Sequence, residues 1–185
     1  IKWIATMQHN AGIVKVVSAL SSLLKNMAKG FHEKVTVRQE LDFLDNYVTI
    51  EKIRYIELFD VEITVDDPAL YNAHIIKLTL QPLVENSIFS GIEPSGKPGL
   101  IQIHILSREE VLYISIRDNG VGISQENIAR LLTDTSRVSK HYMSGIGLPN
   151  VDRRIKLVYG QEYGLSIESE VGVYTCVTVS LPLEI

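Results

Sequence analysis

Asp118 is the first residue whose type and position could do chemistry. It follows the alternating run 111–117, which predicts a strand, and it opens the sequence DNGVGI. A carboxylate at the end of a strand can accept a hydrogen bond from an exocyclic amine such as that of adenine. Gly120 and Gly122 would let the backbone approach a flat base, because glycine has no Cβ. An ordinary hairpin turn, which Asn-Gly also favours, is the alternative.

A second glycine motif, GIGL, contains Gly145 and Gly147 and precedes a helical pattern of apolar residues. A Gly-x-Gly turn at the start of a helix leaves free N–H groups and the positive end of the helix dipole facing anions, which suits phosphates. The alternative is a tight loop without a ligand. Roughly twenty polar residues separate the two motifs, and loops of that length are more often functional or mobile. Together the motifs are typical of a nucleotide site with a mobile cover.

A third motif lies upstream, in the sequence LQPLVENSIFSG (80–91). Pro82 suits the first turn of a helix and Gly91 suits its C-terminal stop. Glu85 and Asn86 lie off the apolar face of this predicted helix. They are either two solvated polar residues, or a carboxylate and an amide oxygen that face Mg²⁺ and phosphate oxygens, since hard oxygen ligands suit a hard cation.

In order and spacing, the three motifs resemble the asparagine box and the two glycine boxes of the Bergerat ATP-binding fold. Gyrase-type topoisomerases, Hsp90 chaperones, histidine kinases and MutL-type repair proteins share that fold. With LQPLVEN, SGIGLPNVDRRIKLVYG and the upstream segment VTVRQELDFLDNYVTIEKIR, the chain is most similar to sensor histidine kinases of the LytS-like subgroup. The resemblance implies an α+β fold: a Bergerat-type α/β sandwich, with helices on one face of a mostly antiparallel sheet, preceded by a helical hairpin remnant.

The resemblance also implies a role for each motif residue. Asp118 would bind the adenine amino group of ATP, and Gly120 and Gly122 would shape the base pocket. Asn86 would hold Mg²⁺, and Glu85 would be the catalytic residue that polarises the nucleophile or a metal-bound water. The nucleotide-binding set is completed by two phosphate-cradling glycines and two polar residues that would brace the lid or approach the phosphates: Gly145, Gly147, Asn150 and Arg154.

Apolar patterns predict the elements that position these residues. A heptad-like seam over 13–29 is consistent either with packing on its own domain or with pairing to a second chain, and the resemblance implies that residues 1–33 are a partial dimerisation and phosphoacceptor region. The resemblance favours the second arrangement, a homodimer through the N-terminal helices. Residues 34–56 form a connecting helix, which starts at a capping box on Thr36. The resemblance implies that residues 57–185 are the ATP-binding catalytic domain.

Composition bounds the possible partners and surroundings. The chain has 185 residues, 45% of them hydrophobic, and a net charge of −4, which suits one core with an appendage. Mild acidity without a basic run argues against nucleic acid as a partner. No apolar stretch approaches the ~18 residues of a membrane span, so any membrane contact is expected through other segments. The single cysteine, Cys176, is predicted to be a buried thiol in a reducing, cytoplasmic setting.

Two departures from the family pattern stand out. The family usually reads Ala-Ile-Lys-His-Gly where this chain has SIFSG, so Phe89 and Ser90 replace a cation near the phosphates and a histidine. The family's phosphoacceptor motif, Pro-His-Phe-Leu-x-Asn-Thr-Leu, would lie just before the segment that matches residues 1–8, and it is missing. The chain also begins within a helical pattern. We therefore expect a fragment that binds Mg·ATP but does not phosphorylate itself at the family site.

The resemblance implies the cytoplasmic catalytic portion of a two-component sensor histidine kinase. Such a protein transfers the γ-phosphate of ATP to a histidine, for relay to an aspartate of a response regulator. A degenerate nucleotide-binding module that signals by dimerisation is the main alternative, motivated by Phe89 and Ser90. A stand-alone serine kinase of the anti-sigma type shares the fold, but the helical hairpin and the extended match argue against it.

Overall fold

A computed structural model of the protein describes residues 11–27, 33–133 and 147–185. Its central sheet has the strand order β2–β4–β5–β7–β6. The strands are β2 (Phe59–Val65), β4 (Gly99–Arg108), β5 (Val111–Asp118), β6 (Gly164–Glu170) and β7 (Tyr174–Pro182). β2 runs parallel to β4, and the other neighbouring pairs are antiparallel. The predicted α+β fold with a mostly antiparallel sheet is confirmed.

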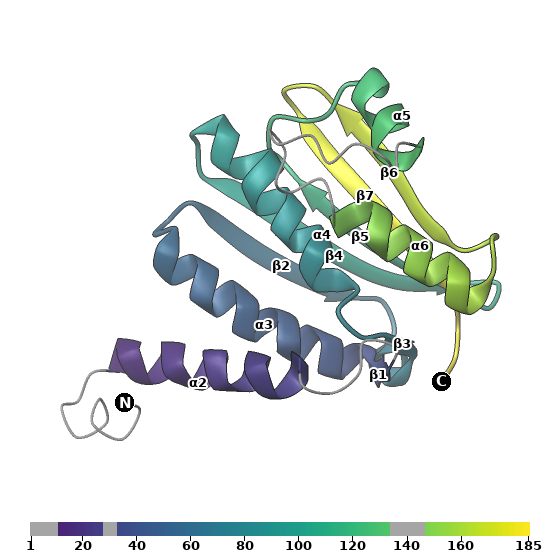
Figure 1. The fold of residues 1–185 in the computed structure, drawn as a ribbon, viewed down its shortest axis with the longest axis horizontal. Helices are drawn as coiled ribbons and strands as arrows, with labels where there is room; N and C mark the ends of the chain where they lie inside the picture. The colour runs from purple at the N-terminus through teal and green to yellow at the C-terminus, as the bar shows by residue number, and fades with distance from the viewer. Residues whose placement is uncertain (1–10, 28–32, 134–146) are drawn as a thin grey trace.

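Helices cover one face of this sheet (Figure 1). They are α3 (Val37–Arg54), α4 (Leu80–Asn86), α5 (Gln125–Thr133) and α6 (Gly147–Tyr159), while α2 (Ala11–Met27) lies on the outer side of α3. Helix α4 continues directly into a π-helical turn, η2 (Ser87–Ile92), which is followed by the short 3-10 helix η3 (Glu93–Ser95). Helix α3 lies beside α4, and α2 packs along α3 (Figure 1). No helix within the described residues is long and apolar enough to cross a membrane.

The core follows from the alternation of side chains along the strands. Alternate residues of β5, β7 and the middle of β4 point toward the helices and are buried. The buried apolar residues of these three strands are Ile101, Ile103, Ile105, Leu112, Ile114, Ile116, Val177, Val179 and Leu181. The helices place Leu80, Leu83, Val84, Leu148, Val151 and Ile155 against them. Cys176 lies on the alternate row and is only half-buried, so the prediction of a buried thiol was wrong.

Helix α3 begins where the sequence predicted. The Thr36 hydroxyl accepts a hydrogen bond from Gln39 N at 3.2 Å, and the Gln39 side chain accepts one from Thr36 N at 3.0 Å, which completes the capping box. The apolar stripe of α3 belongs to the same core as the sheet. How the chain divides at residues 33 and 56 into folding units stays a prediction.

A two-stranded sheet that the sequence did not indicate fixes the entry to α3. Strand β1 (Lys34–Thr36) pairs antiparallel with β3 (His74–Ile76). A 3-10 helix, η1 (Pro68–Asn72), leads into β3, and the turn at residues 77–79 connects β3 to α4. The backbone start of α3 is therefore held next to the turn that precedes α4.

Candidate nucleotide-binding site

Asp118 ends β5 with its carboxylate inside the protein. The residue is only 2% exposed. Its Oδ1 accepts a hydrogen bond from Gly120 N at 3.0 Å, and the Ser87 hydroxyl donates a second one. Burial raises the pKa of the carboxyl group, although both hydrogen bonds and Arg117 oppose that shift. Ser87 directly follows Asn86, so the first glycine motif and the asparagine-box motif meet at this carboxylate.

The glycines near Asp118 allow backbone segments to touch. A Cβ on Gly91 would lie 2.6 Å from Oδ1 of Asp118, and a Cβ on Gly120 would lie 2.2 Å from the carbonyl carbon of Gly91. Between the two segments, Val121 N donates to Gly91 O at 3.0 Å. Gly122 has a φ of 69° and would place a Cβ 2.2 Å from the carbonyl oxygen of Glu170. Larger residues would therefore push the segments around the carboxylate apart.

Asn86 and Glu85 lie in different surroundings although they are neighbours in sequence. Asn86 is 8% exposed, at the point where α4 becomes π-helical, and such turns are frequent at functional sites. Glu85 is half-buried, and burial raises the pKa of its carboxyl group. Its charge acts on Tyr47 and Glu51 of α3. The charge of Glu85 is thus close enough to α3 to affect titratable groups there. The catalytic role of Glu85 stays a prediction.

The second glycine motif contacts α4 near its amino end, at Pro82. Gly147 is the first residue of α6, and a Cβ on it would lie 3.3 Å from Cβ of Pro82 in α4. Asn150 is exposed in the first turn of α6. Gly145 lies outside the described residues. The amino end of α6 is therefore packed against α4, as a shared phosphate site would require.

Arg154 occupies a position that the sequence reading did not foresee. Its Nη2 donates a hydrogen bond to the carbonyl oxygen of Leu78 at 2.7 Å, in the turn before α4. The side chain is half-buried, and burial lowers the pKa of the guanidinium while Glu40 opposes that shift. The guanidinium thus contacts the protein backbone, and a role in bracing the lid or approaching phosphates stays a prediction.

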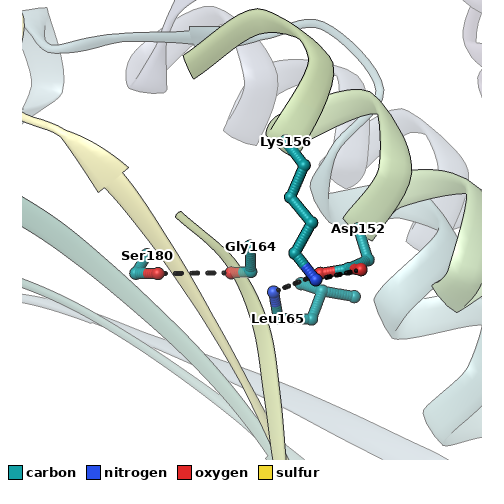
Figure 2. Close-up of polar contacts among 5 residues, drawn as sticks. All are labelled: Asp152, Lys156, Gly164, Leu165 and Ser180. Atoms are coloured by element: carbon teal, nitrogen blue, oxygen red, sulfur yellow. Dashed lines mark hydrogen bonds and ion pairs between the residues drawn. The ribbon is translucent and has the colours of Figure 1, made fainter. Parts of the chain in front are cut away.

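Asp152 attaches α6 to the sheet edge (Figure 2). Its Oδ1 accepts a hydrogen bond from Leu165 N at 2.9 Å, and its Oδ2 binds Lys156 Nζ at 2.7 Å. A Cβ on Gly164 would lie 2.5 Å from Oδ1 of Asp152, so this glycine leaves room for the carboxylate. Ser180 of β7 donates to the Gly164 carbonyl at 3.4 Å. These contacts attach α6 to the edge strand β6.

Phe89 belongs to an aromatic cluster with α3. Its ring lies 5.9 Å from the Tyr55 ring in an edge-to-face arrangement, a favourable geometry for aromatic pairs. The Arg54 guanidinium carbon lies 5.0 Å from the Tyr55 ring centre and 5.8 Å from that of Phe89. The position where the family usually has a lysine is therefore used for packing in this chain.

These residues fit a purine nucleotide with Mg²⁺. The buried Asp118 carboxylate can accept further hydrogen bonds, and glycine backbone surrounds it. Among the described residues, no group of three or more histidines, cysteines or acidic residues could hold a metal by itself. Magnesium at nucleotide sites usually takes one or two protein ligands together with phosphate oxygens and water, so a single amide oxygen such as that of Asn86 suits it.

Comparison with known families gives two matches. Residues 72–185 match the family described as Histidine kinase-, DNA gyrase B-, and HSP90-like ATPase, and residues 1–59 match the family described as Histidine kinase. The first match covers more than half of the chain. The chain therefore belongs to the family of histidine kinase-, DNA gyrase B- and HSP90-like ATPases.

Individual relatives place the chain among sensor histidine kinases. Sensor histidine kinase YesM of Bacillus subtilis (strain 168) is 34% identical over 182 residues, which cover 98% of this chain and 30% of that protein. Sensor protein LytS of Bacillus anthracis is 27% identical over 151 residues, which cover 82% of this chain and 25% of that protein. The chain thus spans 30% or less of the length of these relatives. The resemblance to LytS-like sensor histidine kinases is confirmed.

Solved structures support the fold assignment. The catalytic domain of histidine kinase ThkA superimposes with a TM-score of 0.59 at 16% identity, covering 82% of this chain and 95% of that chain. The mycobacterial sensor histidine kinase MprB gives the same TM-score of 0.59 at 19% identity, covering 83% of this chain and 98% of that chain. At these identities the similarity concerns the fold alone, and it is the fold that the sequence predicted.

Proposed function

We propose that this chain is the catalytic portion of a two-component sensor histidine kinase that transfers the γ-phosphate of Mg·ATP to a histidine upstream of residue 1. An aspartate of a response regulator would then receive the phosphate. The observation that carries the proposal is the convergence of three motifs on α4. Ser87, next to Asn86, hydrogen-bonds Asp118, and Gly147 packs against Pro82.

Each residue would contribute by position or charge. Asp118 would accept a hydrogen bond from the adenine amino group, with Gly120 and Gly122 against the base. Asn86 would supply an oxygen to Mg²⁺, which neutralises charge on the phosphates. The first N–H groups of α6 would face the phosphates, together with the glycine turn before them.

In the transfer, the bond between the γ-phosphorus and the bridging oxygen of ATP breaks, a phosphorus–nitrogen bond forms, and ADP leaves. The imidazole nitrogen that attacks must lack a proton or lose one. Glu85 would polarise this imidazole by accepting a hydrogen bond from it. Burial raises the pKa of Glu85, which makes its carboxylate a stronger base than an exposed one.

The N-terminal helices would form a homodimer. Ile13 and Leu20 of α2 are 43% and 48% exposed, although both belong to the predicted heptad seam. Pairing with a second α2 would bury them. We place residues 1–33 in this dimerisation region and residues 57–185 in the ATP-binding domain, within the cytoplasmic part of a membrane-anchored protein. Sedimentation of the chain with and without Leu20→Glu tests the dimer.

Isothermal titration calorimetry with Mg·ATP tests nucleotide binding. We expect a micromolar dissociation constant for the wild-type chain, and Asp118→Ala should weaken it at least tenfold, because each hydrogen bond to a charged group is worth about 1.5–3 kcal/mol. Kinase activity is tested on a chain extended through the upstream histidine. Acid-labile phosphorylation that Glu85→Gln reduces would support the proposal, and its absence from the wild type would refute it.

A degenerate nucleotide-binding module without kinase activity is the second candidate. It is favoured by the packing of Phe89 on Tyr55 beneath Arg54, at the position where the family usually carries a lysine. Phe89→Lys separates the two candidates. If the chain is a kinase, the lysine should leave turnover unchanged or raise it. If an inactive extended wild type gains acid-labile phosphorylation only with Phe89→Lys, the module reading is correct.

A further inference from the structure

Glu40 is a charged side chain buried in the middle of the helical layer. It belongs to the apolar stripe of α3 and is only 1% exposed. Its Oε2 accepts a hydrogen bond from Leu78 N at 2.9 Å, and its Oε1 accepts one from Leu80 N at 2.9 Å. The backbone N–H of Thr79 also hydrogen-bonds the carboxylate. Glu40 therefore binds the free N–H groups at the start of α4, which have no partner within the helix.

Arg154 of α6 holds the same turn from the opposite side. Its Nη2 donates to Leu78 O at 2.7 Å and lies 3.5 Å from the Thr79 hydroxyl. Its positive charge also acts on the Glu40 carboxylate. The turn at residues 77–79 is thus held from two sides. Glu40 of α3 accepts hydrogen bonds from its N–H groups, and Arg154 of α6 donates one to its carbonyl oxygen at Leu78.

The turn has a backbone conformation that requires such support. Leu78 has a φ of 57°, in the left-handed region that costs free energy for a residue with a Cβ. Residues in sparsely populated conformations persist when the surrounding contacts determine them. The turn determines where α4 begins, and α4 ends six residues after its start with Asn86.

We infer that Glu40 and Arg154 are positioning residues for nucleotide binding, which hold the amino end of α4 against α6 so that Asn86 and Gly147 keep one relative arrangement. The nucleotide part of this inference rests on the proposed function. Neither residue needs to touch the nucleotide. Because Glu40 belongs to α3, against which α2 packs, the same contacts connect the N-terminal helices to α4.

The substitution Glu40→Gln tests the inference with little change in shape. Both oxygens of the carboxylate face backbone N–H groups, and a backbone N–H cannot become an acceptor. The glutamine NH₂ would therefore oppose one of these donors, so one hydrogen bond is lost. Asp42→Asn is the matched control, because it removes the same charge from an exposed position on the same helix.

Two measurements are made on the whole chain under conditions where each variant is fully folded. The first is the dissociation constant for Mg·ATP. The second is amide hydrogen exchange, compared between residues 78–86 and the strands β5 and β7. For Glu40→Gln we expect roughly tenfold weaker binding and roughly tenfold faster exchange at residues 78–86, with little change in the strands. Asp42→Asn should stay within about twofold of the wild type in both measurements.

An unchanged dissociation constant in fully folded Glu40→Gln would overturn the inference, since a purely structural role alters stability and not the affinity of folded molecules. Exchange that accelerates equally at residues 78–86 and in the strands would overturn it as well. If Glu40→Gln does not fold, Arg154→Lys takes its place, and the same two outcomes decide. A wild type that does not bind Mg·ATP would refute the proposed function instead, and local exchange alone would then decide whether Glu40 orders α4.

Discussion

The two ends of α4 are each organised by a buried carboxylate, and the two carboxylates are used differently. At the amino end, Glu40 receives hydrogen bonds from three consecutive backbone N–H groups and faces the charge of Arg154. At the carboxyl end, Asp118 receives one backbone N–H, from Gly120, and one hydroxyl, from Ser87. A carboxylate has about four acceptor sites. Glu40 uses three of them, whereas Asp118 uses two and can still accept hydrogen bonds from a ligand.

This difference separates positioning from recognition. The partners of Glu40 are backbone N–H groups, which can donate hydrogen bonds but cannot accept them. Such fixed partners suit a carboxylate that holds a turn in place. The partners of Asp118 include a hydroxyl, which can turn to donate or accept, so the hydrogen bonds of this carboxylate can rearrange when a ligand binds. We therefore expect substitutions at the carboxyl end of α4 to affect ligand binding, and substitutions at the amino end to affect the local order of α4 as well.

The largest effect is expected from Gly120→Ala. The new Cβ would lie 2.2 Å from the carbonyl carbon of Gly91, and neither atom can rotate away, because the first is fixed by its own backbone and the second is a backbone atom. We expect a loss of about 3 kcal/mol or more in the free energy of unfolding, at the upper end of overpacking costs. Urea denaturation measures it.

Gly96→Ala is the control for that experiment. Gly96 also has a left-handed φ, 64°, but a Cβ on it would meet nothing within 4 Å. Its cost should be only about 1 kcal/mol, the backbone cost alone. Equal losses for Gly96→Ala and Gly120→Ala would mean that the contact between Gly91 and Gly120 is not tight.

Asp118→Asn should separate affinity from stability. The amide keeps an acceptor for Gly120 N, and the Ser87 hydroxyl can turn to accept from its NH₂. Because burial raises the pKa of Asp118, removing the charge removes a cost of folding, and the free energy of unfolding should stay within about 1 kcal/mol or rise. Affinity for Mg·ATP should fall at least ~10-fold, since the NH₂ would face the adenine amino group.

Thermal or urea unfolding beside calorimetry checks this prediction. Glu40→Gln is the comparison. No partner of residue 40 can accept a hydrogen bond from the new NH₂ group, so this substitution should weaken both the local order of α4 and the affinity for Mg·ATP. If Asp118→Asn binds Mg·ATP as tightly as the wild type, Asp118 does not recognise the base, and the contrast between the two ends of α4 disappears.

Asp152→Ala tests the attachment of α6 to β6. The carboxylate is mostly buried and accepts from Leu165 N, so its loss should lower the free energy of unfolding by about 2 kcal/mol. The dissociation constant for Mg·ATP in folded molecules should stay within about twofold, unlike that of Glu40→Gln. Lys156→Met, which removes only the partly exposed ion pair, should cost less than about 0.5 kcal/mol.

The smallest effect is expected from pH. Burial raises the pKa of Glu40, Glu51, Glu85 and Asp118 above their usual values. The folded state therefore binds protons at a higher pH than the unfolded state does, and the stabilisation this gives is lost as pH rises through the raised values. Stability should be nearly constant above the raised values and should increase modestly as pH is lowered through them toward the usual carboxyl pKa of about 4. Affinity for Mg·ATP should fall over the same range as Asp118 takes up a proton. Stability that falls steadily over this range would contradict the assignment.

Much of the fold follows from local sequence patterns. Alternation in β2, β4, β5 and β7 predicted the strands, and the capping box predicted the start of α3. β1 and β3 were missed because three residues are too few to show alternation. The π-helical turn was missed because Gly91 predicted the C-terminal end of the helix. Instead the helix continues through Gly91 to Ile92, and the backbone of Gly91 packs against Gly120.

Local motifs could name candidate site residues, but they could not name the distant residues that support them. The resemblance named Asp118, Gly120, Asn86 and Gly147 as candidates, and their roles stay predictions. The contact of Glu40 with Leu80 joins residues 40 positions apart, and no local pattern reports such a contact. One indication was available in the sequence. Glu40 lies between Val37 and Leu44 on the apolar stripe of α3, and a charged residue within a buried stripe needs a partner.

The central claim is that three motifs around α4 bind one nucleotide. Amide hydrogen exchange of the wild-type chain with and without Mg·ATP tests it most directly, because it reports each motif separately. We predict slower exchange at residues 86–91, at residues 119–122 and in the first turn of α6, all with the same dependence on nucleotide concentration. Protection confined to one of these segments, or absent from all three at saturating Mg·ATP, would contradict the account.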